Sequence, residues 1–340
     1  MKLPSQTLQD WAAAVFRQCG VAEADASVTA RILVRTSLRG IDTHGVARIP
    51  SYVANLRSGE FNPAARPQLT EQHGTLQCDG QAGLGQVVGM AALQASMARA
   101  DRQAIVACTI RNCGHLAALG TLVLEAAERG LVAVLCQSTP PILGLPGFRG
   151  RAIGNNPLAF AMPVAGEAPL VFDMAMSEVA RGRVLEAMRE GRATIPEGWA
   201  VDTQGRPTTG TREAAQGAMI AAAGHKGMGL AMLVECLAAS LSGASVAAGM
   251  SASGGSSGSA GAFLLVANPQ LLVGQASFDE SVRHWLGHYG QAAGGDGRYP
   301  GQRQARSEAD RAASGIPVAD GLRSELAALG EQLGVPFPGA

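Results

Sequence analysis

Ala104-Ile105-Val106-Ala107-Cys108-Thr109-Ile110-Arg111-Asn112-Cys113-Gly114-His115 is the stretch that decides the fold class of this chain. The run 104–110 is apolar and rich in β-branched residues, which predicts a strand that ends at the polar group 111–115. A helix is expected next over 118–129, followed by a second strand over 131–136. Because strands alternate with helices here, the sequence predicts an α/β layered domain.

The rest of the chain carries mostly helical patterns before and after this region. Helices are expected over 8–19, 24–38, 49–57, 86–100, 179–190, 226–241, 279–289 and 320–333. Further strands are expected over 75–79, 158–163, 169–173 and 262–266. The segments 60–70, 138–157 and 194–211 are typical of loops, as is a basic stretch before the last helix, and the Gly/Ser run 249–261 predicts no regular structure.

Several sites that are common in nucleotide-binding and hydrolytic enzymes are missing from the sequence. The glycines of Gly83 to Gly89 have the wrong spacing for the Gly-x-Gly-x-x-Gly turn of a Rossmann fold, and no phosphate-binding P-loop is present. The sequence also contains no serine nucleophile elbow. The six histidines are scattered and predict no metal site. A dinucleotide, if bound, is therefore not held by the usual glycine fingerprint.

Composition restricts the partners of this 340-residue chain. Hydrophobic residues make up 47% and charged residues 16%, which supplies a large core for more than one lobe. Lys+Arg and Asp+Glu both number 27, so charge gives no reason to expect nucleic acid or an anionic membrane as partner. Glu235 interrupts the longest apolar stretch, which argues against a membrane span. Without an export signal or a Cys-x-x-Cys pair, the six cysteines predict reduced thiols and a cytoplasmic protein.

The segment Arg39 to Tyr52 brings together side chains that suit acid–base chemistry. Asp42 or Thr43 is expected to cap a short helix that begins near His44. Residues four apart share a helix face, so His44 and Arg48 would point the same way. A histidine transfers protons near neutral pH and an arginine grips a carboxylate with two bonds. The spacing fits a small carboxylate substrate, and a helix start with a purely structural histidine fits it about equally well.

Three other positions are candidates for ligand binding, and each also has a structural explanation. His115 follows a strand, where catalytic groups gather in α/β proteins, or it stabilises the turn after the strand. His225 and Lys226 open the apolar helix, where a phosphate is favoured, although a solvated lysine at a helix start is the more common case. Asp173 ends a strand and either binds a cofactor or caps the next turn.

Several short sequence blocks follow one another along about residues 8–330. They are Gly40-Ile41-Asp42-Thr43-His44-Gly45-Val46-Ala47-Arg48, 111–115, 154–160, 172–177, 180–183, 196–202, 224–227 and Tyr299-Pro300-Gly301. In this order the blocks resemble the malate/L-lactate dehydrogenase type 2 oxidoreductases. That family includes ureidoglycolate and sulfolactate dehydrogenases, diketogulonate reductase and the Δ1-piperideine-2-carboxylate/Δ1-pyrroline-2-carboxylate reductases.

The resemblance implies a non-Rossmann α/β fold of the sulfolactate dehydrogenase type, with a mixed, largely antiparallel sheet flanked by helices. It implies a homodimer whose active site lies between lobes. We expect a helical substrate and dimer lobe from 1–65 plus about 280–340. We expect an NAD(P)-binding α/β lobe from about 66–280, with a sub-lobe at about 117–160 as an option.

The resemblance also implies roles for individual residues. His44 would donate a proton to the substrate oxygen or nitrogen, and Arg48 would bind the carboxylate. Thr43 or Asp42 is placed to orient the imidazole, and Asn155 stands where a threonine usually faces the substrate. NAD(P)H would be held by the remaining positions, namely His115, Leu116, Ala117, Ala118, Leu119, Asp173, Met174, Ala175, His225, Lys226, Gly301 and Arg303.

The substrate class depends on a few departures from the family pattern. Hydroxy-acid members tend to have Arg-Gly-Lys where this chain has Arg181-Gly182-Arg183, and imine-reducing members tend to have His-Gly-Asp. This favours interconversion of a 2-hydroxy acid and a 2-oxo acid. The segment 115–119 looks more like the imine reductases, so reduction of a cyclic imine carboxylate is the alternative. Changes at Asn155, Arg183 and Gln302 leave a nucleotide-binding relative without turnover as a third option. The choice between NADH and NADPH is open.

Overall fold

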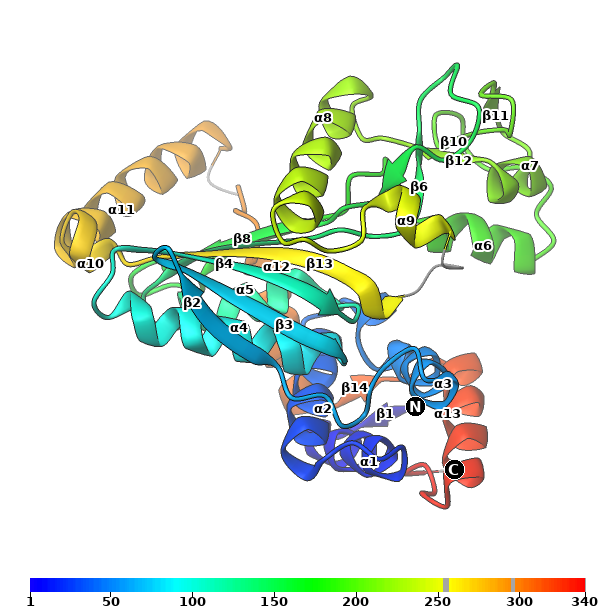
Figure 1. Ribbon diagram of the computed structural model, residues 1–340, viewed down its shortest axis with the longest axis horizontal. Helices are drawn as coiled ribbons and strands as arrows, with labels where there is room; N and C mark the ends of the chain where they lie inside the picture. The colour runs from blue at the N-terminus through cyan, green and yellow to red at the C-terminus, as the bar shows by residue number, and fades with distance from the viewer. Residues whose placement is uncertain (253–256, 295–296, 340) are drawn as a thin grey trace.

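The computed structural model describes residues 1–252, 257–294 and 297–339, and Figure 1 shows how they are arranged. Its largest sheet contains seven strands. They are β2 (Gln68–Gln72), β3 (Thr75–Gly83), β4 (Ile105–Cys113), β5 (Val132–Gln137), β8 (Leu158–Met162), β9 (Leu170–Met174) and β13 (Ala260–Ala267).

The order of these strands excludes a Rossmann fold. They run β2-β3-β4-β13-β5-β8-β9, so the late strand β13 lies in the middle of the sheet (Figure 1). Only β3 and β4 are parallel, and every other neighbouring pair is antiparallel. A Rossmann sheet is mostly parallel, with a helix crossing between strands. The prediction of a mixed, largely antiparallel sheet flanked by helices is confirmed.

Helices cover both faces of this sheet. Helices α4 (Gly85–Ala100) and α5 (Leu119–Ala127) pack on one face, and α8 (His225–Val234) leads into the π-helix η3 (Glu235–Ser240) over the other (Figure 1). Along β4 the buried residues Val106, Cys108 and Ile110 alternate with less buried ones, as the two-residue period of a strand requires. The apolar α4–α5 layer and one face of the sheet therefore form the main core.

A second sheet forms a smaller layer at the upper right of Figure 1. Its order is β11-β10-β12-β6-β7. The bounds of its strands and nearby helices are β6 (Pro141–Gly144), β7 (Ile153–Gly154), β10 (Ala200–Val201), β11 (Pro207–Thr208), β12 (Ala218–Ile220), α6 (Arg181–Arg189) and α7 (Thr211–Gln216). This sheet has its own apolar core together with α8.

The two ends of the chain meet in a helical part below the main sheet (Figure 1). Here α1 (Ser5–Gln18), α2 (Glu23–Leu38) and α3 (Ile49–Ser58) pack with α13 (Asp320–Leu333), and β1 (Lys2–Leu3) pairs with β14 (Ile316–Pro317). The remaining elements are α9 (Ala247–Ala252), η4 (Ser257–Ser259), α10 (Pro269–Leu272), α11 (Gln275–Ala292) and α12 (Gln302–Ser314). The predicted division into lobes stays a prediction, and the second sheet uses residues 141–220.

Several of the sequence predictions about local structure were wrong or incomplete. The predicted loop 194–211 contains the short strands β10 and β11. The predicted loop 138–157 contains β6 and β7, which are too short to show a periodic pattern. The predicted basic loop contains α12, in which no residue is buried. Its Glu308 instead bonds Arg35 and Arg39 of the α2 region, at 2.9 and 2.7 Å. The Gly/Ser run extends into α9, η4 and β13, and its residues 253–256 lie outside the described residues.

None of the described helices is both long and apolar enough to cross a membrane. Within the same residues no group of three or more His, Cys, Asp and Glu side chains is arranged to hold a metal ion.

Candidate active site

Two 3₁₀ turns carry the His44 segment into helix α3. They are η1 (Asp42–His44) and η2 (Val46–Arg48), with Gly45 between them. A side chain at Gly45 would stand 2.1 Å from Ser37 Oγ, and the Val46 N–H donates to that same oxygen at 3.1 Å. Close packing on α2 therefore requires glycine here. The predicted helix begins at Ile49, so His44 ends a turn and does not start a helix.

His44 is half-buried and oriented by its neighbour. Its Nδ1 lies 2.8 Å from Thr43 Oγ1. Burial, and then the charge of Arg48, lowers the pKa of His44 to about 4. Of the two expected orienting groups, Thr43 makes the contact. Asp42 instead binds Arg311 with both carboxylate oxygens, at 2.5 and 3.1 Å.

Arg48 carries a buried hydrogen-bond donor without an acceptor. Its Nε has no partner among the described residues. A buried unpaired donor on a charged group costs free energy, and a bound carboxylate would remove this cost. The charge of Arg48 also lowers the pKa of both His44 and His115, so the three side chains form one electrostatic cluster.

His115 joins this cluster from the end of β4. Its ring centroid lies 5.8 Å from that of His44. Its Nδ1 lies 2.8 Å from the hydroxyl of Tyr52 on α3, and Gln86 on α4 donates to its carbonyl oxygen at 3.1 Å. A Cβ on Gly85 would stand 2.3 Å from that same carbonyl, so glycine lets the start of α4 approach His115 closely. Burial, then Arg48 and His44, lower the pKa of His115 to about 3.

Gln137, at the end of β5, holds the loop after His115 in place. Gln137 is fully buried, accepts from Leu116 N–H at 3.0 Å and donates to Gly114 O at 2.9 Å. Ala117 in this loop has a φ of 66°, a left-handed conformation that costs an alanine about 1 kcal/mol or more. Such strain persists only where surrounding contacts determine the backbone, and it gathers at functional sites.

The expected cofactor positions 115–119 and 173–175 meet at the start of α5. The Gly120 N–H donates to Asp173 Oδ2 at 2.7 Å. Surrounding protein atoms desolvate this carboxyl and raise the pKa of Asp173 to about 6, against the lowering effect of that hydrogen bond, although part of the side chain stays exposed. The loop before Gly301 lies on the same strand, because Pro300 O accepts from Val171 N–H at 2.9 Å.

Further contacts connect the segments 115–119 and 173–175 to the start of α8, and together these residues form a line from His115 to α8. Asn155 Oδ1 accepts from Ser177 N–H at 2.8 Å, so its side chain supports the segment after Asp173. Ala222 N–H donates to Met176 O at 2.8 Å, which brings the start of α8 to the same place. His225 and Lys226 are exposed there. Asn156 fixes the arrangement by donating to Ala231 O of α8 at 2.9 Å.

Arg303 is not part of this line. It lies on α12 at a basic depression of about 360 Å³ that also contains Lys2, Arg306 and Arg311. The exposed Arg183 stands in the first turn of α6.

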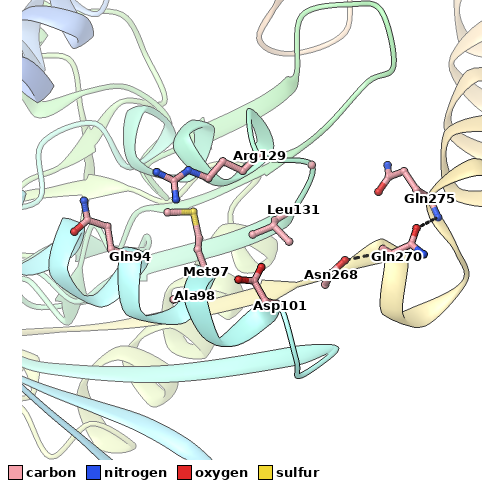
Figure 2. A pocket seen from close by; sticks show the side chains of 10 residues that line it. Gln94, Met97, Ala98, Asp101, Arg129, Leu131, Asn268, Gln270 and Gln275 are labelled. Carbon is pink, nitrogen blue, oxygen red and sulfur yellow. Dashed lines mark hydrogen bonds between the residues drawn. The ribbon is translucent and has the colours of Figure 1, made fainter.

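A larger cavity of about 450 Å³ lies at the other end of the main sheet. Figure 2 shows Asp101 and Arg129 on either side of the apolar side chain of Met97, with Asn268 and Gln270 at the rim. It opens beside the start of β4, whereas His115 follows the end of that strand. None of the predicted site residues lines this cavity, and none lines a further cavity of about 500 Å³ beside β2, β3 and β4. The candidate site is therefore the cluster at His44.

Three residues of the site were not identified from the sequence: Tyr52, Gln86 and Gln137. Tyr52 gave a signal, since it follows Arg48 by four residues and shares its helix face. Gln86 and Gln137 gave none, because a buried glutamine has no spacing rule. Both bond the backbone around His115, which the sequence places far away.

The lowered pKa values of His44 and His115 predict that the folded protein loses stability in acid. Their pKa values of about 4 and 3 in the folded protein lie below the value of about 6.5 expected in the unfolded chain. Between these values the unfolded chain binds more protons, so stability falls as pH decreases, by at most ~1.4 kcal/mol per pH unit for each histidine. The melting temperature should therefore drop between about pH 7 and about pH 5, and less steeply in His115→Asn. Equal slopes in both proteins would contradict the lowered pKa of His115.

Comparisons with known proteins agree with this fold. Residues 3–327 match the family model described as malate/L-lactate dehydrogenase. The chain is 35% identical to a Δ1-pyrroline-2-carboxylate/Δ1-piperideine-2-carboxylate reductase of Pseudomonas putida, covering 98% of this chain and 97% of that protein. It is 30% identical to L-sulfolactate dehydrogenase of Methanocaldococcus jannaschii, covering 94% of each.

A solved structure shows the same relationship. The Δ1-piperideine-2-carboxylate reductase of Pseudomonas syringae pvar. tomato has a TM-score of 0.86 and 32% identity, covering 97% of this chain and 99% of that one. Family model, relatives and fold agree over nearly the whole length, and the chain is an oxidoreductase that belongs to the malate/L-lactate dehydrogenase family.

Proposed function

We propose that this protein interconverts a 2-hydroxy acid and a 2-oxo acid with a nicotinamide cofactor, NADH or NADPH. The observation that carries the proposal is the cluster of His44, Arg48 and His115, in which the buried Nε of Arg48 finds no acceptor in the described part of the chain. A carboxylate next to the reacting carbon supplies the missing acceptor and places that carbon beside an imidazole.

Arg48, His44 and Thr43 have distinct tasks in this proposal. Arg48 binds the carboxylate and fixes the position of the neighbouring carbon. His44 exchanges a proton with the substrate oxygen, and Thr43 holds its ring through Nδ1. Because Arg48 is one of the two causes that lower the pKa of His44, a carboxylate on Arg48 raises that pKa and prepares His44 to donate.

The cofactor fits the line of contacts from His115 to the start of α8. When bound, a nicotinamide dinucleotide supplies the hydride. The residues to hold it are 115–119, Asp173 to Ala175, the loop at Gly301, and His225 with Lys226. The partly protonated carboxyl of Asp173 is suited to polar groups of a ribose or an amide, because it both donates and accepts hydrogen bonds.

Reduction of a cyclic imine carboxylate is the second candidate. The relative with 35% identity is a reductase of this class. An imine that already carries a proton on nitrogen needs none from the enzyme, and the lowered pKa keeps His44 neutral at neutral pH. The same grip of Arg48 on the carboxylate serves both reactions.

A homodimer is also part of the proposal. The apolar side chains of Leu230, Met232 and Leu233 on α8 are 41%, 57% and 47% exposed in the single chain. Exposed apolar side chains gathered on one helix are typical of a protein interface. Light scattering should give twice the chain mass of 34.7 kDa.

The proposal is tested by following NAD(P)H absorbance with each cofactor and a panel of substrates. The panel contains 2-oxo acids, including pyruvate, oxaloacetate and sulfopyruvate, together with Δ1-piperideine-2-carboxylate and Δ1-pyrroline-2-carboxylate. Turnover of an oxo acid supports the dehydrogenase. Turnover of the imines alone replaces it with the reductase, and cofactor binding without any turnover favours a non-catalytic relative.

A further inference from the structure

Two hydrogen-bond donors, a backbone N–H and the Tyr52 hydroxyl, together determine which ring nitrogen of His115 carries its proton. The N–H of Ala117 lies 3.3 Å from His115 Nδ1, and a backbone amide can only donate. This long contact favours Nδ1 as an acceptor, with the proton of the neutral ring on Nε2. The lowered pKa of His115 agrees with a ring that stays neutral.

Tyr52 strengthens the same assignment. Its hydroxyl oxygen lies 2.8 Å from Nδ1 and its side chain is 2% exposed. Two acceptors lie within reach of the Tyr52 hydroxyl, His115 Nδ1 at 2.8 Å and His115 O at 3.2 Å, and the nearer Nδ1 takes its proton. The hydroxyl thereby acts as a second donor to the nitrogen that must stay unprotonated.

Gln86 fixes the direction of the Tyr52 hydroxyl. Its Nε2 lies 3.1 Å from His115 O and 3.4 Å from Tyr52 Oη. A carbonyl accepts only, so Nε2 and not Oε1 must face it. The amide therefore donates to Tyr52 Oη as well, and Tyr52 uses its own proton on His115. Gln86 is fully buried, and its Oε1 has no hydrogen-bond partner among the described residues, which indicates that this orientation is maintained at a cost.

We propose that Gln86 and Tyr52 are positioning residues that hold His115 as the Nε2–H tautomer, so that a neutral imidazole donates a fixed hydrogen bond to the substrate. The proposal rests on the function proposed above, because the acceptor is the oxo or imine carboxylate held by Arg48. The Nε2–H of His115 has no acceptor among the described residues. His44 exchanges the proton. Next to it, His115 polarises the C=O or C=N bond of the substrate, and this effect does not change with pH.

Nitrogen NMR of protein with ¹⁵N-labelled histidine rings tests the tautomer without any turnover. The His115 signals are identified by their loss in His115→Ala. In the wild type, Nδ1 should resonate as an unprotonated and Nε2 as a protonated nitrogen, with no change between about pH 6 and 8. A protonated Nδ1 in the wild type would overturn the proposal, even if the enzyme reduces an oxo acid as expected.

Two nearly isosteric variants test the positioning roles. Tyr52→Phe removes the hydroxyl donor, and Gln86→Glu replaces the amide with an acceptor that draws the Tyr52 proton away from His115. Both should populate the Nδ1–H tautomer and lower kcat at least about tenfold, because an incorrect tautomer removes the donor that the reaction needs. The dissociation constant for the cofactor should stay unchanged.

The double variant separates positioning from general structural damage. Both single changes act on the same proton, so Tyr52→Phe with Gln86→Glu should lower kcat no further than Tyr52→Phe alone. Tyr289→Phe, which removes an exposed hydroxyl 3.4 Å from Arg298 O, is the matched control and should leave kcat unchanged. Additive losses in kcat, or a wild-type tautomer in Tyr52→Phe, would show that the two residues serve only stability.

Discussion

His44→Ala is expected to lower kcat at least ~100-fold, because general acid catalysis by a positioned group contributes about 10² to 10⁴ in rate. The structure places His44 in a half-buried turn, held through Nδ1 by Thr43 at 2.8 Å. The opposite nitrogen is thereby left to exchange a proton with the substrate. Steady-state kinetics with the substrate found in the panel give the loss in kcat, and fluorescence titration gives the affinity for the cofactor.

The pH dependence gives His44→Ala a second readout. Reduction of an oxo acid needs protonated His44, so the wild-type kcat should fall as pH rises above the pKa of His44 in the substrate complex. Oxidation of the hydroxy acid needs neutral His44, so its kcat should rise with pH over the same range. Both dependences should vanish in His44→Ala. The exposed His288→Ala is the matched control and should behave as the wild type. Near-normal turnover by His44→Ala would remove His44 from the mechanism.

Arg48→Lys is expected to raise the KM for the carboxylate substrate about 10- to 100-fold, because loss of a charge-assisted hydrogen bond costs about 1.5–3 kcal/mol. A lysine keeps the charge but cannot bind a carboxylate with two parallel bonds. It also lacks the buried Nε, which has no acceptor within residues 1–252, 257–294 and 297–339. The smaller expected effect on kcat distinguishes anchoring by Arg48 from proton transfer by His44.

Arg48→Leu should be more severe and should also change His44. Without the positive charge, one cause of the lowered pKa is lost, so the pKa of His44 should rise toward its ordinary value. Arg57 lies on the exposed side of the following helix, so Arg57→Lys is the matched control. If Arg48→Lys leaves KM unchanged, the carboxylate is bound elsewhere.

The sequence predicted most of the larger elements because their periodicity is local. The last helix was expected over 320–333 and is Asp320–Leu333, and the strand expected over 262–266 is the middle of Ala260–Ala267. Apolar side chains recur along these segments with the period of one buried face, which requires no knowledge of the rest of the chain. The absent glycine fingerprint correctly excluded the Rossmann fold.

Elements without a buried face could not be predicted in this way. Helix α12 buries no residue, and it is held by Glu308 and Arg311, which bond residues about 270 positions earlier in the chain. The short strands β6 and β7 depend on neighbours in the second sheet. Their stability comes from partners that the local sequence does not reveal.

The sequence by itself determined the chemical groups of the site: an imidazole and a guanidinium four residues apart, and a second imidazole at the end of a strand. Only the tertiary structure decided how they work together. Packing of α3 and α4 against the end of β4 brings Tyr52 and Gln86 to His115, although 63 residues separate Tyr52 from His115. Burial of this cluster keeps both imidazoles neutral and leaves the Nε of Arg48 without an acceptor among the described residues. Desolvation and hydrogen-bond direction depend on every element around a group, so they appear only once the chain has folded.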